Sequence, residues 1–220
     1  MYNNFEFKTK QGTASLNRVI LRIYHKMCSI KGAEEMEKVL DRRVLKTRNS
    51  LKATFIELLL NEDFDDLTVK VIAEKANIGR KTFYLHYLDK YDLMDAVIDD
   101  YFSELAATCE RHVNLIFDEK AKVWFDFFEK HRLFFKKLFQ STGSYSFRNK
   151  FLDFTTDQLF KKADFNYSED LEIKIRFLSY GVNGIIESFV LQSIKQDTFE
   201  VSKQVAHLVY SNLDLKIPER

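Results

Sequence analysis

The chain has 220 residues, a net charge of +1, six glycines and one proline. The near-neutral charge excludes a uniformly basic nucleic-acid-binding protein, and the shortage of helix-breaking residues predicts long helices. No segment alternates β-branched and polar residues as a strand does. We therefore expect an all-α fold, with part of its 15% aromatic residues available for a ligand site or a subunit interface.

The cysteines and the apolar segments indicate the compartment. Cys28 and Cys109 are the only cysteines, and they lack the CxxC spacing of redox and zinc sites. The apolar run at 19–24 is short and contains Arg22, so we expect neither a membrane span nor a signal peptide. These features predict a reduced, cytoplasmic protein with no membrane contact.

Residues 1–35 stand apart as a segment in which Lys and Arg outnumber Asp and Glu. Three interpretations remain open: a flexible basic arm that enters a minor groove, an extra helix around 14–30, or a stretch upstream of the true start. Basic residues remain in excess up to residue 90, whereas acidic residues are in excess over 91–220. Such an asymmetry is expected when one end of a protein touches phosphate groups, although by itself it decides nothing.

A short helix followed by a tight turn is predicted directly after Leu67. The Thr68 hydroxyl can cap a helix over about 69–76, and Leu67 and Ile72 are spaced for a hydrophobic staple across its start. Asn77 then breaks the apolar periodicity, and asparagine tolerates the left-handed backbone of a sharp turn. This helix therefore has a buried side and a defined end.

A second helix is predicted over about 80–87, with Phe83 and Tyr87 on its core side. The residues left on its outer side are Arg80, Lys81, Thr82, Tyr84 and His86. Two short helices joined by a tight turn are the layout of a helix-turn-helix, whose second helix contacts base edges and phosphates of DNA. The alternative is that Arg80 and Lys81 only begin a solvated helix.

A longer helix is predicted from about 90 to 107. Asp89 can cap it, and Leu88 and Leu93 are spaced for a second staple. The start of this helix therefore marks the end of the helix-turn-helix.

Aromatic residues crowd the next part of the chain. Helices are predicted at about 121–139, 146–163, 169–195 and 198–213, with a break at Ser141–Ser144. The first of these is predicted to line a pocket for a hydrophobic effector, through Trp124, Phe127, Phe128, Phe135 and Phe139. The alternative is an ordinary packed core, because phenylalanines at helical spacing usually pack together.

The last two predicted helices each carry an apolar stripe. Two such helices per subunit can form a four-helix bundle across a two-fold axis, which predicts a homodimer. The predicted interface consists of Ile175, Leu178, Gly181, Val182, Ile185, Phe189, Val205 and Leu208. The alternative is that both stripes pack within their own subunit.

Catalytic and metal-binding motifs are absent from the sequence. There is no GxSxG, HExxH, GxGxxG, CxxC or phosphate-cradling GxxxxGK[ST] pattern. His112 and His131 have no partners at metal-ligand spacing. We therefore expect neither an enzyme nor a protein with a metal or cofactor.

The run from Leu67 to Val97 resembles, without a gap, the N-terminal signature of the TetR/AcrR family of bacterial transcription regulators. Family members usually have Gly at the place of Asn77 and Ser or Thr at the place of Gly79. The resemblance implies a three-helix helix-turn-helix DNA-binding domain over 36–90 and a helical effector-binding and dimerisation domain over 91–220.

The resemblance also implies a first helix from about Leu40 to Leu60 that precedes the helix-turn-helix. Its buried stripe would be Leu51, Phe55, Ile56 and Leu59, and Lys90 would contact a phosphate. The DNA-contacting set that it implies is Arg43, Thr47, Arg48, Thr68, Arg80, Lys81, Thr82, Tyr84, His86 and Lys90.

Residues 177–189 are similar to a branch of this family that includes the activator of dihydroxyacetone-kinase operons. The function implied is a homodimeric regulator, as a rule a repressor, that binds double-stranded palindromic operator DNA. A small hydrophobic effector in the C-terminal domain would release it. The alternative is a DNA-bound adaptor whose C-terminal domain binds a protein coactivator.

Overall fold

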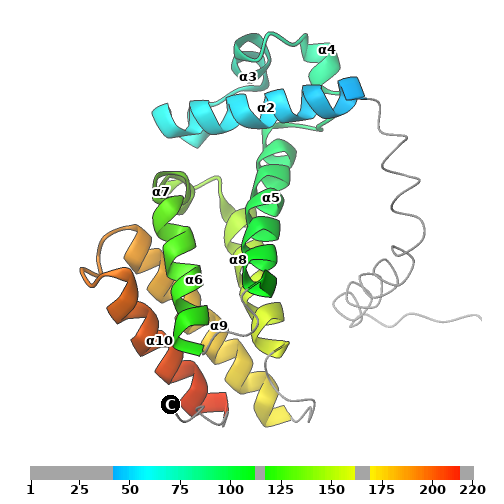
Figure 1. Ribbon diagram of the computed structural model, residues 1–220. Helices are drawn as coiled ribbons and strands as arrows, with labels where there is room; N and C mark the ends of the chain where they lie inside the picture. Colours follow the sequence, from blue (N-terminus) through cyan, green and yellow to red (C-terminus); the bar gives the residue numbers. More distant parts are fainter. Residues whose placement is uncertain (1–41, 112–116, 162–168, 214–220) are drawn as a thin grey trace, which may run out of the picture. The chain divides into compact units, whose positions relative to one another are not determined.

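The structure is a computed structural model that describes residues 42–111, 117–161 and 169–213. The predictions for residues 1–35 lie outside this range. The chain divides into two units, Met1–Thr47 and Arg48–Arg220, and the described part of the first is the start of helix α2. Every regular element in the described ranges is a helix, which confirms the predicted all-α fold (Figure 1).

The N-terminal helices match the predicted order, with one short addition. They are α2 (Arg42–Asn61), the 3₁₀ turn η1 (Phe64–Asp66), α3 (Val69–Lys75), α4 (Arg80–Phe83) and α5 (Lys90–Arg111). The C-terminal helices are α6 (Phe117–Lys130), α7 (Arg132–Gln140), α8 (Tyr145–Phe160), α9 (Glu169–Val190) and α10 (Thr198–Leu213). None of the helices in the described ranges is both long and apolar enough to cross a bilayer.

The chemistry of single residues sets the helix ends in the N-terminal half. The Thr68 hydroxyl accepts a hydrogen bond from the Val71 amide at 3.2 Å, so it caps α3 as predicted. Asn77 has φ of 54°, the left-handed conformation predicted for the turn that ends α3. Asp89 caps α5, because its carboxylate accepts from the amides of the second and third residues of that helix. The predicted Leu88 staple is wrong, since that side chain is 82% exposed.

Two predicted helices of the C-terminal half have different boundaries in the structure. The helix predicted at 121–139 is broken at His131, where the backbone leaves the helical conformation between α6 and α7. The helix predicted at 169–195 already ends at Val190. The Arg132 guanidinium donates to the carbonyl oxygens of Phe189 and Val190 at 2.6 and 3.4 Å, so a side chain from α7 satisfies the last carbonyls of α9.

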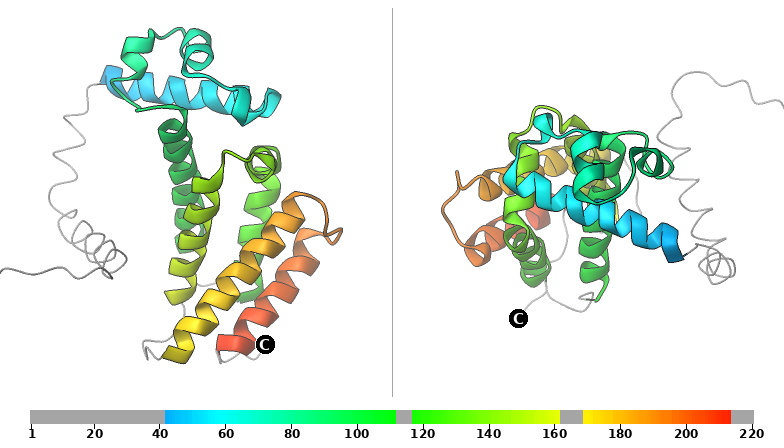
Figure 2. Two further views of the ribbon diagram at one scale, coloured as in Figure 1. Left: turned by 180° about the vertical axis from the view of Figure 1, so that it is seen from behind. Right: turned by 90° about the horizontal axis from the view of Figure 1, so that it is seen from above.

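The C-terminal helices form a bundle with an aromatic interior. Helix α6 packs along α10, α8 packs along α9, and α5 contacts both α6 and α8. Helices α9 and α10 lie side by side in both views (Figures 1 and 2). Phe128, Phe135, Phe147 and Phe151 are all nearly or fully buried, and neighbouring rings stand 4.6 to 6.0 Å apart. The aromatic cluster predicted at 124–139 is thus mainly packed core.

Candidate nucleic-acid interface and C-terminal cavity

The helix-turn-helix is built from α3, the turn at Asn77 and residues 80–87, here called the recognition segment. Only its first turn is α-helix, because α4 ends at Phe83 rather than at the predicted residue 87. The backbone continues as hydrogen-bonded turns, with the amides of His86 and Tyr87 both donating to the Phe83 carbonyl at 2.9 and 3.0 Å. Phe83 and Tyr87 are buried and pack against each other, which confirms the predicted core side.

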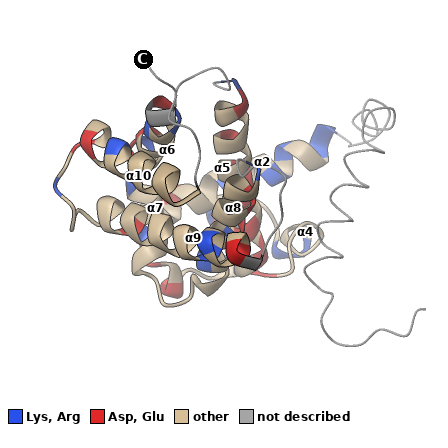
Figure 3. Ribbon diagram, turned by 90° about the horizontal axis from the view of Figure 1, so that it is seen from below, with Lys and Arg blue, Asp and Glu red and all other residues tan. Residues whose placement is uncertain are grey.

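The outer side of the recognition segment is polar and basic. Arg80, Lys81 and Tyr84 are exposed, whereas Thr82 and His86 are half-buried. Figure 3 shows the basic residues on α4. Leu85, which is not among the predicted contact residues, is 80% exposed between Tyr84 and His86. A large apolar side chain exposed next to hydrogen-bonding groups is chemically suited to contact a thymine methyl group.

The remaining residues predicted to contact DNA differ in their exposure and in the hydrogen bonds that they already make. Arg48 is half-buried, and its guanidinium lies 5.7 Å from the centre of the Tyr87 ring. The Thr68 hydroxyl is exposed while it caps α3, and it keeps a proton to donate. Arg43 and Thr47 lie in the first turns of α2, where the Thr47 hydroxyl donates to the Arg43 carbonyl at 2.8 Å.

Lys90 has a structural role that the sequence did not indicate. Its ammonium group donates to the carbonyl oxygens of Phe64 and Asp65 at 2.9 and 3.0 Å, and it lies 4.6 Å from the centre of the Phe64 ring. Lys90 therefore ties η1 to the start of α5. Two of its three protons are occupied, which leaves one for a phosphate.

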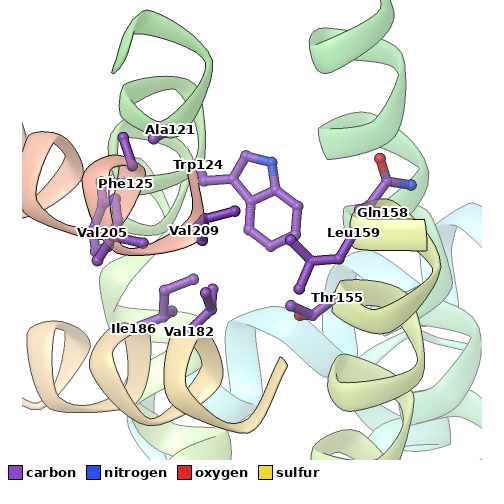
Figure 4. Close-up of a pocket in the computed structure, with 11 residues that line it drawn as sticks. Ala121, Trp124, Phe125, Thr155, Gln158, Leu159, Val182, Ile186, Val205 and Val209 are labelled. Atoms are coloured by element: carbon purple, nitrogen blue, oxygen red, sulfur yellow. The ribbon is translucent and has the colours of Figure 1, made fainter. Parts of the chain in front are cut away.

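A cavity lies among α6, α8, α9 and α10, close to the predicted pocket but not identical to it (Figure 4). Its walls are Ala121, Trp124, Phe125, Thr155, Gln158, Leu159, Val182, Ile186, Val205, Ala206 and Val209. Of the five predicted pocket residues, only Trp124 lines it. Phe127, Phe128, Phe135 and Phe139 pack in the aromatic core, because large rings fill space when they interdigitate.

The predicted dimer residues fall mostly inside the subunit. Those with side chains buried in the core of their own subunit are Ile175, Leu178, Val182, Phe189 and Val205. Ile185 is partly buried against the same core, whereas Gly181 and Leu208 are exposed. The buried stripe binds α9 to α8 and α10, so it is not free to contact a second subunit.

The outer face of α9 carries a different apolar stripe. Ile173, Phe177 and Tyr180 are 68%, 71% and 66% exposed, and they follow helical spacing along one side. Gly181 and Gly184 lie on the same side, and a Cβ atom added at either one would meet no atom within 4 Å. The glycines therefore do not serve close packing within the subunit.

A cluster of ionisable side chains joins α5 to the corner between α6 and α7. The Lys130 ammonium lies 2.8 Å from a Glu104 carboxylate oxygen, and this hydrogen bond lowers the pKa of Glu104. Nε2 of His131 lies 3.6 Å from the same oxygen, and burial lowers the pKa of His131. Burial likewise raises the pKa of Tyr101, whose ring packs on the histidine. None of these residues lines the cavity, and no group in the described ranges is arranged to bind a metal.

Comparison with known proteins agrees with both halves of this arrangement. Residues 53–97 match the model of bacterial regulatory proteins of the tetR family, and residues 117–211 match that of a transcriptional regulator C-terminal region. A curated relative, the HTH-type transcriptional regulator YxbF of Bacillus subtilis (strain 168), is 37% identical over 78 residues. That match covers 35% of this chain and 20% of the relative, so the chain spans about a fifth of that protein's length.

Solved structures share the fold at low sequence identity. A TetR transcriptional regulator from Streptococcus agalactiae 2603V superposes with a TM-score of 0.62 at 24% identity, covering 79% of this chain and 98% of that one. The dihydroxyacetone kinase operon activator DhaS superposes with a TM-score of 0.57 at 17% identity, covering 78% and 98%. The chain is a transcriptional regulator rather than an enzyme, and it belongs to the TetR family.

Proposed function

We propose that the protein is a homodimeric repressor that binds a palindromic operator, with the recognition segment of each subunit in a major groove. A dimer bound over a promoter excludes RNA polymerase, which is the physical basis for repression. A ligand in the C-terminal cavity would then release the operator.

The observation that carries this proposal is the division of the recognition segment into two sides. Phe83 and Tyr87 anchor it in the core, so its outer groups are presented from a fixed backbone. Arg80 and Lys81 supply charge for phosphates, and the Tyr84 hydroxyl can reach base edges or phosphates. Charge for affinity and hydrogen-bonding groups for specificity are thus combined in one rigid element.

The homodimer is proposed to form through the outer face of α9. Ile173, Phe177 and Tyr180 form a stripe that one subunit leaves in water. A two-fold axis would pair this stripe with its own copy, and Gly181 and Gly184 would let the two helices approach closely. Two subunits joined in this way would present two recognition segments to two half-sites.

Release by a ligand requires contact between the C-terminal bundle and the helix-turn-helix. The Lys137 ammonium lies 3.1 Å from an Asp63 carboxylate oxygen, and the Thr142 hydroxyl donates to Asp65 at 3.0 Å. The first contact joins α7 to the residue before η1, and the second joins the α7–α8 connection to η1, which lies shortly before α3. A ligand that moves α7 or α8 would therefore shift the helix-turn-helix.

A protein coactivator is the second candidate for the C-terminal partner. Leu133 and Tyr145 are 69% and 73% exposed, and such side chains can anchor a protein interface. They lie singly rather than in one continuous stripe, whereas the cavity is lined on several sides by apolar side chains. We therefore prefer the small-molecule effector.

Selection from a random library of DNA duplexes tests the proposal. The full chain should enrich an inverted repeat whose half-sites lie about one or two helical turns apart. A variant carrying both Arg80→Ala and Lys81→Ala should fold but enrich nothing, because the substituted side chains are exposed. Failure of the full chain to enrich any sequence, or enrichment of a single half-site, would contradict the proposal.

A further inference from the structure

The cavity has apolar walls and one polar end. Val182, Ile186, Val205 and Val209 form its apolar side, on α9 and α10. The Trp124 indole nitrogen lies on the side of its ring that faces Gln158, whose amide occupies the same end of the cavity (Figure 4). A bound molecule would thus have its polar atoms drawn to that end.

The polar groups around the cavity differ in whether they already have a hydrogen-bond partner within the protein. The Thr155 hydroxyl donates to Asn183 Oδ1 at 2.6 Å and lies 2.9 Å from the Phe151 carbonyl, so it is committed to the α8–α9 contact. Within the described ranges, the Trp124 indole N–H and the Gln158 amide have no hydrogen-bond partner. These two groups offer donors, and the glutamine also offers an acceptor.

Charge is absent from the walls. Within the described part of the chain, no Asp, Glu, Lys or Arg side chain lines the cavity. An ionised group brought there would lose water without gaining a counter-charge, which costs several kcal/mol. The apolar part of the cavity therefore discriminates against carboxylates, phosphates and ammonium groups.

The size of the cavity limits the ligand further. Its volume is about 40 Å³. One water-sized probe needs about 10–15 Å³, so the cavity holds only a few heavy atoms before its walls move. A larger molecule must either extend out of the open side of the cavity or displace its walls, and displacement of α8 is the kind of movement that the proposed release from DNA requires.

We propose that the cavity binds a small, uncharged, apolar molecule with one hydroxyl or carbonyl oxygen, which accepts from the Trp124 indole N–H and pairs with the Gln158 amide. This inference rests on the proposed effector function and specifies the ligand class. A hydroxyl group can also donate to the Gln158 carbonyl oxygen, so an alcohol satisfies both partners at once.

Trp124 is the only tryptophan in the chain, so its fluorescence reports directly on the cavity. The full chain would be titrated with hexanol and, at a pH where it is ionised, with hexanoate. Hexanol should cause a saturable change, and hexanoate should bind at least about tenfold more weakly. Gln158→Leu should weaken hexanol binding about fivefold, the value of one net hydrogen bond.

Matched variants separate this prediction from general damage. Gln140→Leu makes the same chemical change at an exposed position outside the cavity and should leave hexanol binding unchanged. Ala121→Leu places a larger side chain at the wall and should abolish the response, whereas Ala107→Leu on the exposed side of α5 should not.

The inference would be overturned if hexanol gave no saturable change, if hexanoate bound equally well, or if Gln158→Leu bound hexanol like the full chain. Operator binding measured without ligand separates this inference from the proposed function. A chain that binds operator but not hexanol contradicts only the ligand class. A chain that binds hexanol but no DNA contradicts only the proposed binding to an operator.

Discussion

Truncation of Phe177 to alanine should weaken the homodimer strongly. This side chain is 71% exposed in one subunit, on the outer stripe of α9. Complete burial of a phenylalanine contributes about 1.5–3 kcal/mol, so burial of the exposed part contributes about 1–2 kcal/mol. A two-fold axis counts the substitution twice, which gives about 2–4 kcal/mol, or roughly 30- to 1,000-fold in the dimer dissociation constant.

Sedimentation velocity over a dilution series measures this change. Leu133→Ala is the matched control, because Leu133 is 69% exposed on α7 and lies outside the stripe. The control should dimerise like the unsubstituted chain. The melting temperature extrapolated to the monomer should be unchanged in both variants, since neither removes a buried side chain.

Two results would contradict a dimer interface at the outer stripe of α9. Dimerisation of Phe177→Ala at the unsubstituted strength would show that the outer stripe is not the interface. Equal weakening by Leu133→Ala would show that the effect comes from general loss of apolar surface rather than from α9.

Three further predictions concern DNA, pH and the η1 contact. Tyr84→Ala should lower affinity for the selected operator by about 1–3 kcal/mol in a gel-shift assay, with little effect on unrelated DNA. Burial lowers the pKa of His131, so as the pH falls the unfolded chain binds a proton before the folded chain does. The contribution of neutral His131 to stability should therefore be complete above about pH 6.5 and be lost below it. Thermal unfolding should show a smaller loss of stability on acidification in His131→Leu than in the exposed control His207→Gln. Gly143→Ala should lower the stability by about 1–3 kcal/mol, because its Cβ would lie 3.1 Å from two carbons of the buried Phe64 ring as well as 2.6 Å from Asp65 Oδ1.

The helix-turn-helix could be predicted closely because its signals are local. Thr68 caps the helix that follows it, and Asn77 takes the left-handed conformation one helix later. Both depend on backbone geometry within a few residues, which the sequence specifies directly. The helix predicted over 80–87 is too long, because Phe83 and Tyr87 pack in the core whether the backbone between them is α-helix or a series of turns.

The faces of α9 could not be assigned from the sequence. Ile175 and Ile186 face the core of the subunit, whereas Ile173 and Phe177 face solvent, and all four are apolar. Periodicity identifies a stripe only where the opposite side is polar, so a helix that is apolar on two sides has no unique inner face. Only the burial pattern of the folded subunit shows which of the two apolar sides of α9 faces the core.

The position of the cavity could not be predicted from the sequence, for a related reason. Aromatic density suggested that large rings surround a ligand, but Phe128 and Phe135 fill their own space by packing with centroids 4.6 Å apart. The cavity instead forms where small side chains such as Ala121 and Ala206 meet across helices. Helix-to-helix pairing determines which small residues face each other, and a single sequence does not give that pairing.

Lys90 combines two proposed roles that two measurements on one variant can separate. Its two hydrogen bonds to the η1 carbonyls are charge-assisted but half-exposed, so Lys90→Met should lower stability by about 1–2 kcal/mol. In a domain of this size, that is roughly 2–8 °C in melting temperature, whereas Lys203→Met on the exposed side of α10 should change little. If the third proton contacts a phosphate, Lys90→Met should also reduce the salt dependence of operator affinity by about one unit, equally for all sequences. An unchanged melting temperature would refute the tie to η1, and an unchanged salt dependence would refute the phosphate contact alone.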